Sequence, residues 1–108
     1  MPIRETLMSV TAGLVAASAF AQSAAELYRG ADPADGERLI AEHRCSECHA
    51  RKFGGDGNSV YRPAGRINGP GPLRGMVEQC NLELNLGLFP EEVNSIAAVL
   101  NRDHYRFK

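Results

Sequence analysis

The chain lacks tryptophan and has few other aromatic residues, with three tyrosines and four phenylalanines among 108 residues. It also lacks an excess of charge of either sign, because 12 lysines and arginines stand against 13 aspartates and glutamates. The sequence has no basic stripe of the kind that predicts nucleic-acid binding. It also has no paired carboxylates or nucleophile–base set of the kind that indicates an enzyme. A chain this short forms one small domain, and its marginal core is expected to depend on a cofactor, metal or disulfide.

A run of residues long and apolar enough to span a membrane is also missing. Residues 7–20 are apolar, but they are alanine-rich and interrupted by three hydroxyl residues, whereas spanning takes roughly 20 strongly apolar residues. Arg4 before this run and Ala19-Phe20-Ala21 at its end are typical of a cleaved secretory signal, with an uncleaved anchor as the alternative. We therefore expect residues 1–21 to be removed, residues 22–108 to form one periplasmic domain, and no stable membrane insertion.

The chain does contain Cys45-Ser46-Glu47-Cys48-His49, a C-x-x-C-H motif that is the attachment signature of c-type haem. Cys45 and Cys48 can each form a thioether with a porphyrin vinyl group, and His49 can bind the iron as its proximal ligand. A zinc site or a redox dithiol is the alternative use of C-x-x-C. The motif therefore predicts one covalently bound haem c, without which we expect the protein to be largely unfolded.

The spacing of apolar residues predicts an all-α fold of about three main helices wrapped around this cofactor, with no convincing strand. The first helix begins at Asp32-Pro33, a capping residue followed by a first-turn proline, and runs to about position 43 or 44. Gly36 lies inside it, where we expect another helix to cross closely. Residues 51–72 are rich in glycine and proline and predict an irregular loop that covers the haem.

A second helix is expected over residues 73–86, closed by Gly87 as a left-handed cap. Its apolar positions have helical spacing and predict one buried face, formed by Leu73, Met76, Val77, Cys80 and Leu84. The third helix starts at Pro90 and ends near Asn101, and the tail after it is expected to fold back through its aromatic residues.

Several residues around the motif have expected roles. The free N–H of His49 is expected to donate to a carbonyl within residues 68–73. His43 and His104 are expected at the surface. Four basic residues are expected to offset the haem propionates, with plain exposure to solvent as the alternative for each: Arg51, Lys52, Arg62 and Arg66.

With these features the chain resembles small class I-type cytochromes c. The resemblance is carried by the helix containing Gly36, the C-x-x-C-H at its end, Gly71-Pro72-Leu73 and the final helix PEEVNSIAAVLN. It implies that the first and last helices cross, and that the protein transfers one electron to a redox partner protein in the periplasm. The chain departs from the family in having no methionine on the loop before the final helix. The segment MVEQCNLELNLGLFPEEV is instead similar to small monohaem proteins that bind diatomic gases, either sphaeroides haem protein or a His/Cys-ligated pair of anaerobic ammonium oxidisers.

Two thioethers leave Cys80 as an unpaired cysteine in an exported chain. We expect Cys80 to be the distal iron ligand, because its helix precedes the last one and has to cover the open side of the haem. Met76, one turn away on the same face, is the alternative ligand, and Gln79 and Asn81 point elsewhere around the helix. The alternatives for Cys80 itself are a buried core residue and an intermolecular disulfide.

The distal ligand decides the chemistry of the site. A neutral thioether raises the reduction potential, whereas a thiolate lowers it and, once released on reduction, opens the site to CO or NO. We therefore expect a non-enzymatic protein that transfers one electron. The alternative is a module that binds or senses NO or CO through a displaceable ligand and acts as a homo- or heterodimer.

Overall fold

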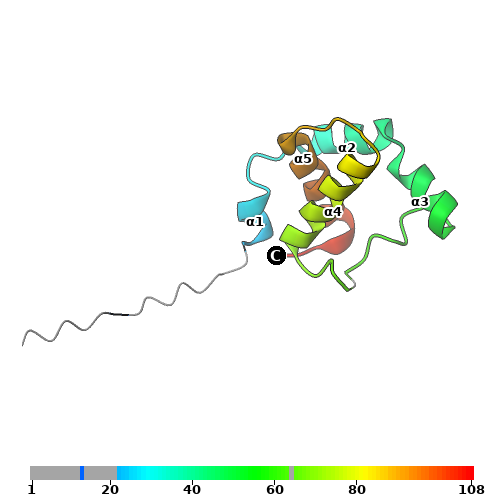
Figure 1. Cartoon of the computed structure of the whole chain (residues 1–108). Helices are drawn as coiled ribbons and strands as arrows, with labels where there is room; N and C mark the ends of the chain where they lie inside the picture. The colour runs from blue at the N-terminus through cyan, green and yellow to red at the C-terminus, as the bar shows by residue number, and fades with distance from the viewer. Residues whose placement is uncertain (1–12, 14–21, 64) are drawn as a thin grey trace, which may run out of the picture.

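The computed structural model describes Gly13, residues 22–63 and residues 65–108, so the expected signal segment lies outside the described residues apart from Gly13. The described chain is helical and contains no β-strand, which confirms the all-α expectation. Among these residues, no helix combines the length and the apolar character needed to cross a membrane. In chain order the elements are α1 (Ala24–Leu27), α2 (Pro33–Glu42), α3 (Cys45–Phe53), α4 (Pro70–Glu83), α5 (Pro90–Leu100) and a π-helix, η1 (Asn101–Tyr105) (Figure 1).

Helix α2 begins as predicted and crosses α5 closely. Asp32 Oδ1 accepts a hydrogen bond from a backbone N–H of the first turn at 3.2 Å, and Pro33 occupies the first helical position. Gly36 is buried, and a Cβ atom added to it would collide with the carbonyl of Ser95 and lie 2.8 Å from Cγ2 of Val99 on α5. The predicted helix crossing at Gly36 is therefore confirmed, and it depends on the missing side chain.

Helix α3 is a separate element, which the sequence did not predict. Arg44 divides it from α2 by adopting a left-handed φ of 52°, an uncommon conformation for a residue other than glycine. The chain was expected to be irregular from Arg51, whereas α3 continues to Phe53 and ends at Gly54. No residue of α3 is buried, and its main helical neighbour is α2, so it extends from one end of the helical core (Figure 1).

Helix α4 is displaced from its predicted range by about three residues at each end. It begins at Pro70, because proline suits the first helical position, and it ends at Glu83. The chain then turns through Asn85, at a φ of 52°, and Gly87, at a φ of 71°. The left-handed glycine was predicted, but the helix ends before it.

The prediction of a single buried face on α4 is wrong in part. Leu73 is buried, Val77 is half-buried and Asn81, one further turn along, is also buried. Met76 and Leu84, by contrast, are 39% and 58% exposed. A helix that packs on one main neighbour, here α5, buries only a narrow stripe. The adjoining stripe, which carries the exposed Met76 and the half-buried Cys80 and is called the distal stripe below, does not belong to the apolar core cluster.

Asn81 joins α4 to the segment that leads into α5. Its Oδ1 accepts a hydrogen bond from the N–H of Leu88 at 2.9 Å, and its Nδ2 donates to the carbonyl of Leu88 at 3.2 Å. Helix α5 then begins at Pro90, as predicted, and Glu92 accepts the N–H of Phe89 at 3.0 Å. These bonds satisfy backbone groups that the connection would otherwise leave unpaired.

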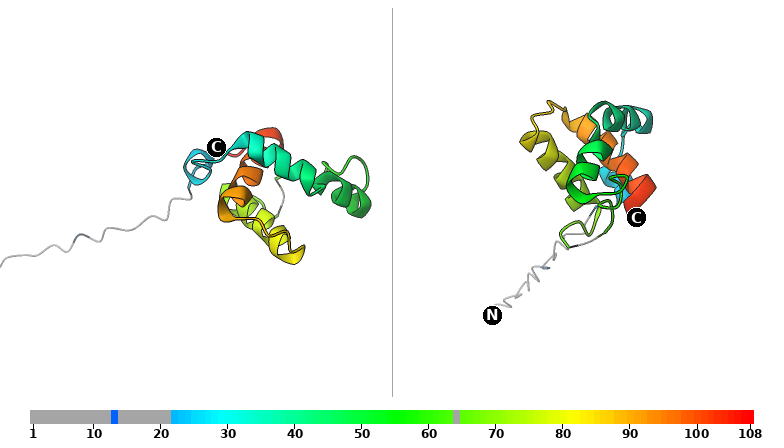
Figure 2. Two further views of the ribbon diagram at one scale, coloured as in Figure 1. Left: turned by 90° about the horizontal axis from the view of Figure 1, so that it is seen from above. Right: turned by 90° about the vertical axis from the view of Figure 1, so that its right-hand side faces the viewer.

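The tail folds back onto the helices, as expected. The side chain of Asn101 accepts the N–H of Phe107 at 2.8 Å and donates to its carbonyl at 3.1 Å, and η1 spans the turn between them. Tyr105 is buried and stacks on Phe107, with ring centroids 5.6 Å apart. The carbonyl of Lys108 accepts the N–H of Ala24 at 3.2 Å, which brings the C-terminus beside α1 (Figure 2).

Candidate cofactor site

The C-x-x-C-H motif forms the first turn of α3. Cys45 is the first residue of the helix, and Cys48 and His49 follow at the i+3 and i+4 positions, which share a helix face with it. Both thiols are free and half-buried. The fold therefore places the three residues predicted to hold haem side by side on one helix.

The imidazole of His49 lies between two aromatic rings. Tyr61 meets it edge-to-face, with ring centroids 5.1 Å apart and an interplanar angle of 75°. Phe53, one turn further along α3, lies at 6.3 Å. The Nδ1 atom of His49 is buried and has no hydrogen-bond partner among the residues that the structure describes.

The expectation that a carbonyl within residues 68–73 accepts a hydrogen bond from His49 is wrong. In this segment the carbonyl of Pro70 instead accepts the hydroxyl of Tyr28 at 2.8 Å. Burial lowers the pKa of His49, and the nearby positive charge of Lys52 lowers it further. His49 is therefore a neutral imidazole at neutral pH, which is the form that binds metal ions.

Helix α4 places Cys80 within electrostatic reach of the motif. Burial raises the pKa of the Cys45 thiol, and a negative charge on Cys80 would raise it further. The pKa of the Cys80 thiol is also raised, by burial first and then by Glu83, whereas Lys52 lowers it. Cys45 and Cys80 are therefore protonated at neutral pH unless a cation binds them.

The residues considered as distal ligands differ in their surroundings. Met76 is 39% exposed and Cys80 is half-buried, and neither belongs to the apolar core cluster. Asn81 is engaged by Leu88, and Gln79 is exposed. Met76 and Cys80 on the distal stripe are therefore free to act as iron ligands, whereas the amide of Asn81 is already bonded to Leu88.

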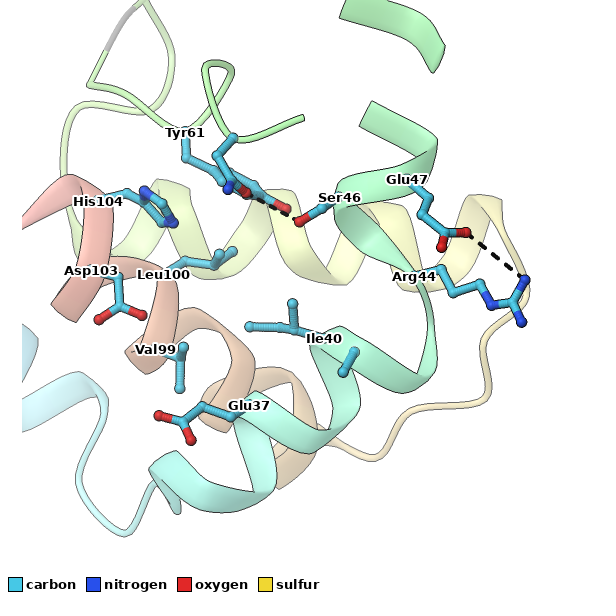
Figure 3. A pocket seen from close by; sticks show the side chains of 12 residues that line it. Glu37, Ile40, Arg44, Ser46, Glu47, Tyr61, Val99, Leu100, Asp103 and His104 are labelled. Carbon is cyan, nitrogen blue, oxygen red and sulfur yellow. Dashed lines mark hydrogen bonds and ion pairs between the residues drawn. The ribbon is translucent and has the colours of Figure 1, made fainter. Parts of the chain in front are cut away.

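A hollow of about 400 Å³ lies beside α3, on the side that carries Ser46 and Glu47 (Figure 3). The cysteines and His49 do not line it, so it is distinct from the thiol face of α3. Its wall includes Tyr61 and His104, whose rings pack in a tilted arrangement with centroids 5.0 Å apart. Its other lining residues are Glu37, Ile40, Ala41, Arg44, Asn58, Val99, Leu100 and Asp103.

The two remaining histidines, His43 and His104, were expected at the surface, and both keep part of their surface exposed. His104 is half-buried because its ring packs on Tyr61, and His43 is half-buried at the end of α2. Sequence reasoning also missed Tyr61, since a lone aromatic residue in a glycine-rich loop has no periodicity that would relate it to His49. The four basic residues proposed to offset the propionates are exposed, and their role stays a prediction: Arg51, Lys52, Arg62 and Arg66.

The side chains around the motif fit a covalently attached haem. Two free thiols one turn apart match its two thioether bonds, and the adjacent imidazole carries a buried nitrogen without a partner in the described chain. Phe53 is 61% exposed and its ring lies 6.3 Å from the imidazole of His49, so a flat apolar cofactor held by the motif would have an exposed apolar side chain beside it.

Comparisons of the chain with protein-family models, curated proteins and solved structures gave no significant match. What the site does is therefore inferred from its own residues and their surroundings.

Proposed function

We propose that the chain is an exported, periplasmic, monohaem c-type cytochrome of class I-like fold, which exchanges single electrons with a redox partner protein and is not an enzyme. The observation that carries this proposal is the first turn of α3. There, two free thiols and a neutral histidine share one helix face, and the histidine has a buried nitrogen that lacks a partner among the described residues. This is the donor set that c-type attachment requires.

Each residue of the set has its own task. Cys45 and Cys48 would form the two thioethers, and His49 would bind the iron on the proximal side. When bound, the haem supplies an iron that gains and loses one electron. The short α3, which buries none of its residues, would leave one edge of the site accessible to a redox partner.

Cys80 is the distal ligand in this proposal, ahead of Met76. Both lie on the distal stripe of α4, and Cys80 lies close enough to the motif for a thiolate charge to act on the Cys45 thiol. Its pKa is raised in the absence of a cation, and coordination to a cation reverses that preference. A thiolate at this position lowers the reduction potential relative to a methionine thioether.

Absorption spectra of the purified holoprotein test this assignment. We expect a ferric thiolate signature that is lost in Cys80→Ala and kept in Met76→Leu, which conserves side-chain volume on the same stripe. A signature that changes in Met76→Leu but not in Cys80→Ala would reverse the order of the two ligands. Colourless protein, or protein that carries zinc in place of iron, would contradict the proposed function as a whole.

Binding of NO or CO is the second candidate function, and the exposure of Met76 on the distal stripe favours it. With Met76 39% exposed, a small molecule can approach the residues beside Cys80 from solvent. Addition of CO to the reduced protein discriminates between the two functions. Ready binding of CO by the wild-type protein supports a gas-binding module. Its mass in solution then shows whether it forms the homo- or heterodimer proposed for such a module. Binding only by Cys80→Ala supports a locked electron carrier.

A further inference from the structure

The loop after α3 fixes the position of Tyr61. Ser46 Oγ donates a hydrogen bond to Asn58 Oδ1 at 3.1 Å, which ties this loop to the first turn of α3. Gly57 is buried against the same turn, at a φ of 82°, and a Cβ atom there would collide with the Ser46 carbonyl and lie 2.9 Å from the Ala50 nitrogen. The N–H of Tyr61 then donates to the carbonyl of Asn58 at 3.0 Å. These contacts fix the loop against α3, and with it the position of Tyr61, four residues after Gly57.

The Tyr61 ring lies between two histidines. It packs edge-to-face on His49, at 5.1 Å and 75°. It also packs on His104 from η1 in a tilted arrangement, at 5.0 Å and 37° (Figure 3). Burial raises the pKa of its hydroxyl above the ordinary value, so the ring is neutral in the physiological range. Tyr61 is therefore held from both sides, by its loop and by His104.

The imidazole of His49 lacks the hydrogen bond that usually fixes the orientation of a metal-binding histidine. A histidine that binds a metal normally donates its second nitrogen to a carboxylate, carbonyl or water, and that bond fixes the rotation of the ring. In the described chain His49 Nδ1 has no such acceptor, and the Pro70 carbonyl is bonded to Tyr28. Edge-to-face aromatic contact is a directional interaction that can restrain a ring in its place.

We propose that Tyr61 is a positioning residue, which sets the rotation of the His49 imidazole by aromatic contact in place of a hydrogen bond to Nδ1. The inference rests on the proposed function in that His49 serves as the iron ligand, although the contact itself belongs to the protein. The ring of Tyr61 carries this role and its hydroxyl does not, so phenylalanine should replace it and an aliphatic residue should not.

Three variants separate this role from general stability. Tyr61→Phe keeps the ring, and Tyr61→Leu removes it. Tyr28→Leu removes the ring of a buried tyrosine from a position that has no contact with His49 among the aromatic pairs of the described chain. We expect the chemical shifts of the His49 ring protons, measured by NMR on the reduced holoprotein, to change only in Tyr61→Leu, and by more than the loss of the Tyr61 ring current accounts for. The ferric-to-ferrous ratio at a fixed ambient potential should change about tenfold in the same variant, the size of effect that such supporting residues have on metal sites.

The outcomes distinguish this inference from the proposed function. Haem-loaded Tyr61→Leu with wild-type ring-proton shifts and ratio, or with changes equal to those of Tyr28→Leu, overturns the role of Tyr61 and leaves the function standing. If these shifts and this ratio change as much in Tyr61→Phe as in Tyr61→Leu, the effect belongs to the hydroxyl, and the proposed role of the Tyr61 ring is overturned. If the folded protein proves free of haem, the proposed function fails, and the ring-proton shifts of the same variants still decide the contact.

Discussion

Asn81 shows how much a single amide contributes in a chain this small. Its two hydrogen bonds to the backbone of Leu88 hold the connection between α4 and α5, and it is buried. We expect Asn81→Ala to lower the free energy of unfolding by about 2 kcal/mol, at about 1 kcal/mol for each bond lost. Urea unfolding measures this change, and Gln79→Ala, which removes an exposed amide two residues away, should stay within about 0.5 kcal/mol of wild type.

The same variant tests where Asn81 lies relative to the cofactor. Because its amide is bonded to Leu88, Asn81→Ala should leave the absorption spectrum of the holoprotein unchanged. A spectrum altered as strongly as that of Cys80→Ala would mean that the Asn81 amide reaches the iron instead of the backbone of Leu88.

Tyr28 gives stability a dependence on alkaline pH. Burial raises the pKa of Tyr28 to about 12, against an opposing effect of Arg74, and its hydroxyl donates to the Pro70 carbonyl. Since the folded pKa lies above the unfolded value of about 10, the stability it contributes is complete below about pH 10 and is lost as the pH rises through about 12. We expect Tyr28→Phe to be about 1 kcal/mol less stable at about pH 7 and to lose less stability between about pH 10 and 12.

Urea unfolding at a series of pH values checks the Tyr28 prediction. Tyr61 and Tyr105 also have raised pKa values, because both are buried, so a part of the alkaline decline should remain in Tyr28→Phe. An equally steep decline in Tyr28→Phe and wild type would show that Tyr28 ionises at its ordinary pKa.

At the scale of helices, the crossing of α2 and α5 depends on Gly36. A Cβ atom there meets the backbone of Ser95, which cannot move as freely as the end of a long side chain. We expect Gly36→Ala to lower the free energy of unfolding by about 2 kcal/mol, as overpacking does in cores. Gly75→Ala is the matched control on α4, where a Cβ atom meets nothing within 4 Å, and it should raise stability by about 0.5–1 kcal/mol. Equal effects of the two changes in thermal unfolding would contradict the close crossing.

Helix ends and the crossing glycine could be predicted from sequence because each has a local physical cause. Asp32 caps, Pro33 and Pro90 start helices, and Gly36 inside a helix calls for a close neighbour. The extent of α3 could not be predicted, because its sequence CSECHARKF is largely charged or polar and buries no residue. A helix shows apolar periodicity in its sequence only if it has a buried face, and α3 has none.

The three motif residues of the candidate site were predictable because they are contiguous in sequence, and Cys80 was proposed from the place of its helix, whereas Tyr61 was not predicted. Cys45, Cys48 and His49 form one motif, and helical spacing places them on one face. Tyr61 and Cys80 come from other segments, and their approach to the motif depends on how the loop and α4 pack. The spacing on α4 predicts a face, but it does not tell how wide a stripe its neighbours cover, so the exposure of Met76 was missed.

For the molecule as a whole, the cofactor is expected to decide whether the chain folds. The core is small, α3 buries none of its own residues, and Phe53 is 61% exposed. We expect the double variant Cys45→Ala/Cys48→Ala, which cannot hold haem covalently, to lose most of its helical circular dichroism signal. Cys80→Ala is the control, since it keeps both thioethers and should keep the helical signal. Native helicity in the double variant would show that the polypeptide folds without the cofactor.

The hydrogen bond between Ala24 and Lys108 has a practical consequence for anyone who tethers this molecule. It places the Lys108 carbonyl beside α1, and Figure 1 and the left view of Figure 2 show α3 at the far side of the molecule from that residue. If the protein is attached to an electrode by a linker after Lys108, α3 will therefore point away from the electrode and stay accessible to a soluble redox mediator.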